Sequence, residues 1–389
     1  MNELLFLLLP LAAASGWYAA ARSQRRRAPK RRDCNLSTDY FRGLNYLLNE
    51  QPDKAIEVFV KLIEVEPDTV EMHLAVGNLF RQRGEVDRAI RIHQNLVARN
   101  NLNLEQRSLA LLELAQDYMR AGLLDRAESL FQELVEINEH SESGLHHLLV
   151  IYQQEKDWEK AIDIARRLQS LTGEPMGAEI GQFYCEQAEQ AQARGASTQA
   201  ADLAARALES DPGSVRASLI TARLAMARQE WRTAVDALKQ VERQDPDFLP
   251  ETLPLLRTCF GRLDDRSEFI AYLHDCLTHH GGISVMLALA DLLRQEHGDE
   301  EAADFIVEQL RARPSVRGLD RLIRLHLEHA EGSEQENLGI LRDLTDKLLE
   351  SEPVYRCCSC GFAGRTLHWQ CPSCKQWNTV KPIHGVAGE

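Results

Sequence analysis

The chain has 389 residues and a formal net charge of −14. Residues 22–32 contribute seven positive charges, so the other residues together carry −21. A body this acidic repels the phosphate backbone of nucleic acids, which argues against a nucleic-acid ligand for the long middle region.

The N-terminal segment has the features of a membrane anchor. Residues 4–21 carry no charge, and as a helix these residues would span about 27 Å, close to the thickness of a bilayer core. Trp17 and Tyr18 suit the membrane interface, and Glu3 stands where a signal peptide would carry positive charge. The sequence therefore predicts a transmembrane helix in residues 1–21.

A basic segment, residues 22–37, follows this apolar stretch. All of its cationic side chains lie directly after the span, which by the positive-inside rule places the bulk of the protein in the cytoplasm. We expect them to contact anionic lipid headgroups, with a nucleic-acid arm or a disordered linker as alternatives. The cations are Arg22, Arg25, Arg26, Arg27, Lys30, Arg31 and Arg32.

The middle of the chain repeats with a period of 34 residues. Gly43 and Gly77 are one period apart, as are Ala55 and Ala89, and Ala200, Ala234 and Ala302 keep the same phase. Small residues that let two helices approach, with aromatic residues such as Phe59 filling the groove between them, are typical of tetratricopeptide repeats. The pattern predicts an all-α, right-handed solenoid of eight to nine helix pairs over residues 38–352.

The repeat is least regular between Thr252 and Leu277. Glu268 occupies the position where the 34-residue phase requires a small residue, and Pro250 and Pro254 leave the start of the first helix undefined. Elsewhere the step lengthens to 38 or 39 residues, which fits insertions in loops.

The sequence offers little for catalysis. It has no P-loop, G-x-G-x-x-G, H-E-x-x-H or G-x-S-x-G motif, and a solenoid has no natural catalytic cleft. The doublets His146-His147 and His279-His280 are expected to be packed or solvated, because neighbouring residues on a helix point to different faces. The charged run Arg81–Arg88 is interpreted as an inter-helix turn with its charges in water, with a docking patch as the alternative. We expect a protein that is not an enzyme.

Four cysteines near the C-terminus have the spacing of a metal site. Cys357 and Cys360 form one C-x2-C pair, Cys371 and Cys374 form a second, and ten residues separate the two. Two such turns complete a closed tetrahedral S4 site, as in rubredoxins and zinc ribbons. The spacing predicts a metal-binding module in residues 353–389.

The predicted site is structural, because four protein ligands leave no open position for substrate or water. The module is too small to bury an adequate core, so one iron or zinc ion would supply much of its folding energy. Cys358 is interpreted as a bystander. The cysteines outside the module are scattered singly and read as small apolar residues in a reducing compartment: Cys34, Cys185, Cys259 and Cys276.

The module's aromatic and basic residues leave alternatives open. Trp369 and Trp377 could stack on RNA bases beside the cationic side chains, or a bound iron could shuttle electrons as an accessory to a redox enzyme. We favour a third interpretation, in which these aromatics pack the module onto the last repeats and its positive charge meets the acidic solenoid.

Three segments together resemble one family over the whole chain. They are ELLFLLLPLAAASGWY, HLAVGNLFRQRGEVDRAIRIHQNL, and YRCCSCGF with LHWQCPSCKQWNTVKPIHG, in this order. In anchor, repeats and metal module the chain is similar to the lipopolysaccharide assembly protein B family of Gram-negative bacteria. The arginine-rich segment, Cys358 and an alanine-rich fifth repeat depart from the family pattern, but none of them removes a family metal ligand.

The resemblance implies a non-catalytic adaptor of the inner membrane. Members of this family promote degradation of the lipid A deacetylase, UDP-3-O-acyl-N-acetylglucosamine deacetylase, by bringing it to the FtsH-type membrane protease. They are also linked to an inner-membrane sulfatase-like regulator that restrains this degradation. A role in organising lipopolysaccharide assembly proteins at the membrane is a further expectation.

Overall fold

The structure, a computed structural model, describes residues 33–49, 51–65, 69–386 and 388–389. The predicted anchor in residues 1–21 and the cations of the basic segment lie outside these ranges. Within the described ranges, no helix is both long and apolar enough to cross a membrane. The chain divides into two compact units, residues 1–151 and 152–389, which are described separately.

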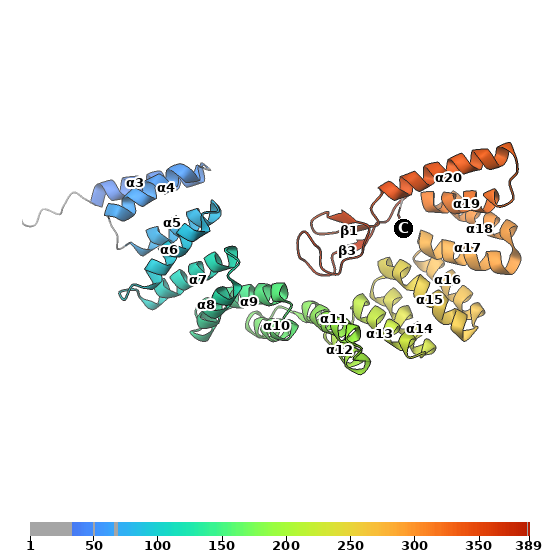
Figure 1. Cartoon of the computed structure of the whole chain (residues 1–389), viewed down its shortest axis with the longest axis horizontal. Helices are drawn as coiled ribbons and strands as arrows, with labels where there is room; N and C mark the ends of the chain where they lie inside the picture. The colour runs from blue at the N-terminus through green and yellow to red at the C-terminus, as the bar shows by residue number, and fades with distance from the viewer. Residues whose placement is uncertain (1–32, 50, 66–68, 387) are drawn as a thin grey trace, which may run out of the picture. The chain divides into compact units, whose positions relative to one another are not determined.

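The first unit consists of paired helices, as the repeat pattern predicts (Figure 1). Its first helix begins at Asp33, inside the segment expected to be a linker. The helices are α3 (Asp33–Leu48), α4 (Pro52–Val65), α5 (Val70–Gln82), α6 (Val86–Val97), α7 (Leu104–Arg120) and α8 (Leu124–Glu136), and α9 (Ser141–Glu155) crosses into the second unit.

The small residues of the repeat allow the two helices of a pair to approach closely. A methyl group on Gly43 would lie 2.6 Å from the Phe59 ring, and one on Gly77 would lie 2.2 Å from Nε2 of His93. His93 therefore takes, one period later, the place of Phe59. The Phe59 and His93 rings are almost fully buried, so the facing positions 43 and 77 have room only for glycine.

A buried polar network connects α5, α6 and α7. Nδ1 of His93 lies 2.5 Å from the carboxylate of Asp117, and Nη1 of Arg81 donates to the other oxygen at 2.9 Å. Arg81 also pairs with Glu113 at 2.5 Å. The expectation that the Arg81–Arg88 run keeps its charges in water is therefore wrong for Arg81, whose side chain is only 17% exposed.

The second unit continues the paired helices and ends in the metal module. Its helices are α10 (Trp158–Thr172), α11 (Gly177–Ala193), α12 (Ser197–Ser210), α13 (Val215–Ala227), α14 (Trp231–Gln244), η1 (Pro246–Phe248), α15 (Leu249–Leu263), α16 (Arg266–His279), α17 (Ile283–His297), α18 (Asp299–Ala312), α19 (Val316–Leu327) and α20 (Ser333–Ser351).

The irregular repeat is shifted by one residue. Phe269, not Glu268, points into the core and is 2% exposed, because α16 begins at Arg266 after its N-cap Asp265. The assignment of Glu268 to the small-residue position is therefore wrong. Glu268 instead pairs with Lys239 and Arg232 at the surface. Pro250 lies in the first turn of α15, where its missing N–H costs nothing, while Pro254 lies within the helix.

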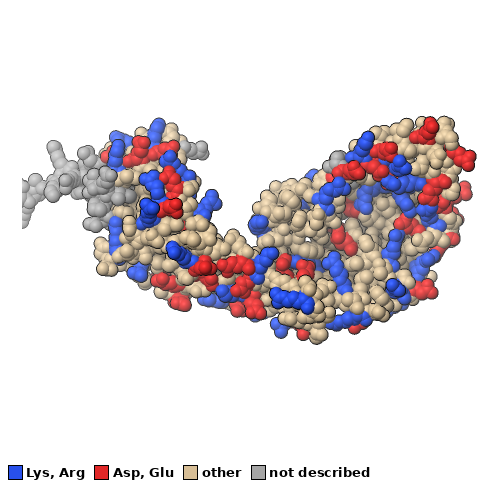
Figure 2. Space-filling model, in the orientation of Figure 1, with Lys and Arg blue, Asp and Glu red and all other residues tan. Residues whose placement is uncertain are grey.

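Charged side chains of both signs are interspersed over the visible face of α17 to α20 (Figure 2). Ion pairs in this unit connect positions one repeat apart, such as Arg257 of α15 with Asp291 of α17 and Arg294 with Glu328. Exposed pairs of this kind contribute little each, about 0–1 kcal/mol, so the apolar core between helices carries most of the stability.

The metal module contains the short strands β1 (Tyr355–Cys357), β2 (Ala363–Gly364) and β3 (Val380–Pro382). They form an antiparallel sheet in the order β2-β1-β3, with Tyr355 opposite both Gly364 and Pro382. The buried side chains at its centre are Cys357, Cys371 and Val380, too few to form a core alone. Figure 1 shows the module folded back against the helices of its own unit.

Candidate metal centre

The four predicted cysteines converge on one point. All four sulfurs lie within 4.8 Å of one another. The sulfurs of Cys357 and Cys374 are 3.8 Å apart, and those of Cys360 and Cys371 are 3.6 Å apart. A tetrahedral ion with metal–sulfur bonds of about 2.3 Å requires sulfurs about 3.8 Å apart. The cluster therefore has the dimensions to hold a metal ion, although the geometry suits both zinc and iron.

The two cysteine turns share one backbone feature. Gly361 follows the first pair with φ of 78°, and Lys375 follows the second with φ of 61°. In each turn this residue's amide donates to the carbonyl of the first cysteine, Gly361 to Cys357 at 3.0 Å and Lys375 to Cys371 at 2.9 Å. The left-handed conformation suits glycine and is unfavourable for lysine, so the second turn is strained where the first is not.

Hydrogen bonds favour the thiolate form, which is the form that binds metal, at two of the four cysteines. The Thr379 hydroxyl, 3.3 Å from the sulfur, and nearby backbone amides lower the pKa of Cys357 to about 6. The backbone amide of Phe362 is the main cause of a lowered pKa at Cys360. Burial raises the pKa of Cys371 to about 11. Since metals bind thiolates, an ion must displace the proton that burial keeps on Cys371.

The other cysteines lie away from the cluster. Cys358 is exposed and its sulfur does not belong to the cluster, while its backbone N–H donates to the carbonyl of Thr379. Cys185, Cys259 and Cys276 are buried as free thiols among apolar helices, and burial raises the pKa of each. Cys34 is described only as part of the backbone of α3.

The module docks onto the solenoid through its two tryptophans. The Trp369 ring stacks on Phe248 with centroids 5.5 Å apart and an interplanar angle of 24°. The Trp377 ring meets Phe183 and Trp158 edge-on, at 6.0 and 6.3 Å. The two tryptophan rings therefore pack onto repeats, as expected. The rings contact α10, α11 and η1, however, and not the last repeats.

A buried arginine lies beneath both tryptophans. The Arg216 guanidinium is 6.0 Å from the centroid of each indole, within the range of cation–π attraction. Its charge is balanced by Glu186 and Glu189, at 2.8 and 2.7 Å. With the module docked Arg216 is only 3% exposed, and its two ion pairs hold the guanidinium where both rings contact it.

Polar contacts surround this aromatic centre. Lys381 pairs with Asp245 and Asp247 at 2.7 and 2.9 Å, as expected for a basic module on an acidic solenoid. The Tyr355 hydroxyl donates to Glu251. Two longer-range amide contacts add to these: Gln182 donates to Asn378 at 2.9 Å, and the Trp377 indole donates to Gln153 at 3.0 Å.

The residues that receive the module could not be identified from the sequence. Arg216, Gln182 and Phe248 lie at ordinary positions of their repeats and belong to no motif. The one available signal in the sequence was Arg216 itself, an arginine within the largely apolar stretch of α13. The histidine doublets behave as expected, since His279 is exposed and His147 stacks on Phe131 at 4.7 Å.

Comparison with known families agrees with these two parts. Residues 355–382 match a family described as a rubredoxin metal binding domain, and residues 42–101 and 185–247 match the tetratricopeptide repeat. Among solved structures, the C-terminal part of a tetratricopeptide protein from Cytophaga hutchinsonii is 16% identical with a TM-score of 0.42, over 64% of this chain and 99% of that one.

Relatives of one name match the chain over nearly its whole length. Lipopolysaccharide assembly protein B of Escherichia coli K12 is 43% identical over 390 residues, covering 100% of both chains. The protein of the same name from Haemophilus influenzae is 38% identical and covers 98% of both. A repeat solenoid with a metal module is the architecture of a scaffold protein and not of an enzyme. The chain belongs to the lipopolysaccharide assembly protein B family.

Proposed function

We propose that the protein is a non-catalytic adaptor of the inner membrane that limits lipopolysaccharide synthesis. In this role it brings the lipid A deacetylase to an FtsH-type membrane protease, and a sulfatase-like inner-membrane protein restrains it. The observation that carries the proposal is the end-to-end match to lipopolysaccharide assembly protein B, at 43% identity. A repeat solenoid with no catalytic motif supports it, because such a surface binds other proteins.

Within this role, Cys357, Cys360, Cys371 and Cys374 hold one zinc or iron ion. The ion is structural and keeps the module folded, so that Trp369 and Trp377 remain docked. Both tryptophans contact the solenoid, and Arg365 and Lys381 contact Glu350 and Asp247. These side chains are therefore occupied within the chain, which disfavours the alternative of an RNA-binding ribbon.

The anchor in residues 1–21 contributes concentration rather than contacts. Tethering adaptor, client and protease to one membrane raises the effective concentration of each for the others. A chain that lacks residues 1–21 should fold and bind the client, yet fail to promote degradation at its normal abundance. Overproduction should restore part of the activity.

The test is affinity isolation from solubilised membranes of the full chain and of the truncated chain, with mass spectrometry of the proteins that co-elute. We expect the full chain to retain the deacetylase and the protease, and the truncated chain to retain the deacetylase with much less protease. Absence of both proteins from the full-chain sample would contradict the proposal.

A further inference from the structure

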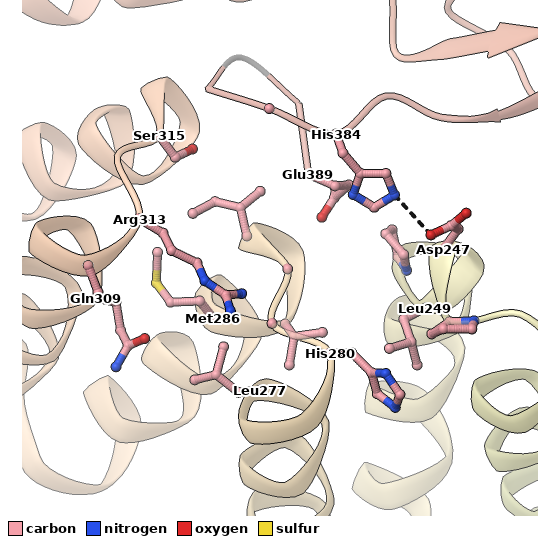
Figure 3. Close-up of a pocket in the computed structure, with 18 of the residues that line it drawn as sticks. Asp247, Leu249, Leu277, His280, Met286, Gln309, Arg313, Ser315, His384 and Glu389 are labelled. Atoms are coloured by element: carbon pink, nitrogen blue, oxygen red, sulfur yellow. Dashed lines mark hydrogen bonds and ion pairs between the residues drawn. The ribbon is translucent and has the colours of Figure 1, made fainter.

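A cavity of about 600 Å³ opens in the second unit, between the ends of helices and the tail of the metal module (Figure 3). Helix ends from α16 and α18 and the starts of α15 and α17 form most of its wall. Residues His384, Gly385 and Glu389 of the tail complete it. Its volume lies within the range of small-molecule sites, about 300–1,000 Å³.

One part of the wall is apolar. Leu249, Leu277, Ile283 and Met286 come from three different helices and line the same space. They belong to the buried cores of their repeats or pack against them, so their positions are fixed by the solenoid. Such a preformed apolar surface suits a short hydrocarbon chain.

Arg313 gives the cavity its charge. Figure 3 shows its side chain extending into the cavity beside Met286. The guanidinium lies against Gly281, where a methyl group would be 1.5 Å from Nη1, so a residue without a side chain makes room for it. Arg313 is solvent-exposed, and within the ranges that the structure describes its guanidinium forms no ion pair or hydrogen bond with another residue.

The acidic side chains of the wall are already paired. Asp247 accepts hydrogen bonds from Lys381 at 2.9 Å and from His384 at 3.1 Å. Glu389 accepts from the backbone N–H of Ser284 at 3.0 Å and pairs with Arg317. Among the charged side chains of the wall that the structure describes, the one without a protein partner is therefore the cationic, solvent-exposed Arg313.

We propose that this cavity binds a small amphiphilic anion. Its carboxylate or phosphate head pairs with Arg313, and its short apolar chain lies on Leu249, Leu277, Ile283 and Met286. Because the tail of the metal module forms one wall, a bound ligand contacts both the module and the solenoid. Such a ligand stabilises the docked module by mass action.

The test uses an octanoate analogue with a diazirine in its chain, applied to the full-length protein in phosphatidylcholine nanodiscs. Cross-linked residues are mapped by mass spectrometry after irradiation. We expect labelling within residues 246–250, 277–286 or 309–315, and competition by octanoate but not by 1-octanol or inorganic phosphate. Octanol tests the charge, and phosphate tests the apolar chain.

Three variants make the result specific. Arg313→Gln should reduce labelling about tenfold, the value of one charge-assisted contact. Arg311 is exposed in the last turn of α18 and does not line the cavity, so Arg311→Gln should leave the labelling unchanged. Ala312→Trp, at an exposed position of the wall, should block the space without disturbing the core.

Each other outcome overturns the proposal. Equal competition by octanol and octanoate, or full labelling of Arg313→Gln, would show that the charge plays no part. Equal competition by phosphate would show that the apolar wall plays none. Labelling confined to other segments would place the ligand elsewhere.

Discussion

The indole of Trp369 in the metal module stacks on the ring of Phe248 in the solenoid, with centroids 5.5 Å apart. Each ring covers an apolar surface that the other part would otherwise expose to water. The module has almost no core of its own. This contact and the packing of Trp377 therefore add apolar burial that the module lacks, and they hold the metal site against the repeats. The predictions below follow from that arrangement.

Replacing Trp369 and Trp377 with alanine should release the module from the solenoid. The double substitution removes two half-buried indoles, each worth about 2 kcal/mol, and with them the aromatic contacts to Phe248, Phe183 and Trp158. Metal content should stay at the wild-type value, because neither residue is a ligand. Limited proteolysis should show new cleavage around residues 352–354.

The matched control for this double variant is Trp231→Ala. Trp231 is a partly buried indole of the same unit that does not contact the module. Its loss should reduce stability without producing new cleavage around residues 352–354. Docking that survives the loss of both module tryptophans would contradict the account.

Replacing Cys371 and Cys374 with serine should abolish metal binding and unfold the module. The remaining pair cannot complete a tetrahedral site, and the ion supplies much of the module's folding energy. Elemental analysis of the purified full-length chain should detect no stoichiometric metal. Cys358→Ser serves as the control and should retain one ion per chain. One ion per chain in the double variant would refute the four-ligand assignment.

The two cysteine turns should respond oppositely to substitution. Lys375→Gly relieves a left-handed residue and should stabilise the module by about 1 kcal/mol, whereas Gly361→Ala introduces the same strain and should destabilise it by a similar amount. The rate at which a chelator removes the metal reports both changes, since removal requires the module to open. Identical removal rates for the two variants and wild type would show that these φ values do not limit stability.

The sequence predicted the parts of the molecule that depend on local spacing. The two cysteines of a C-x2-C pair meet because a single turn brings them together. A 34-residue period with small residues at Ala55 and Ala89 specifies paired helices without any long-range contact. The metal cluster and the solenoid could therefore be recognised before their structure was known.

The rest depends on contacts between residues that are distant in sequence. Nothing periodic connects Trp369 with Phe248, and Arg216 looks like any polar residue until both indoles lie over it. Arg81 looked solvated because its partners, Glu113 and Asp117, belong to the next repeat. Glu268 was misplaced because its repeat shifts by one residue, which a fixed period cannot reveal.

In the first unit, Asp117→Ala should destabilise the fold by about 3 kcal/mol. Asp117 is fully buried and is the shared partner of His93 and Arg81, so its loss leaves the buried His93 ring without a partner and removes one acceptor of Arg81. Urea unfolding should show a lower midpoint. Arg83→Ala, which breaks only surface pairs with Asp53 and Glu85, should change the free energy of unfolding by no more than about 0.5 kcal/mol. Equal effects of the two substitutions would show that the buried network adds nothing.

The central claim, that this protein is an adaptor for degradation, is tested most directly by the half-life of the lipid A deacetylase. Pulse-chase labelling should be carried out in cells with the full-length chain, without it, and with the Cys371→Ser/Cys374→Ser variant at equal abundance. The account predicts rapid turnover with the full chain, and a lengthened half-life with excess lipopolysaccharide in the other two strains. The same half-life with and without the protein would contradict it.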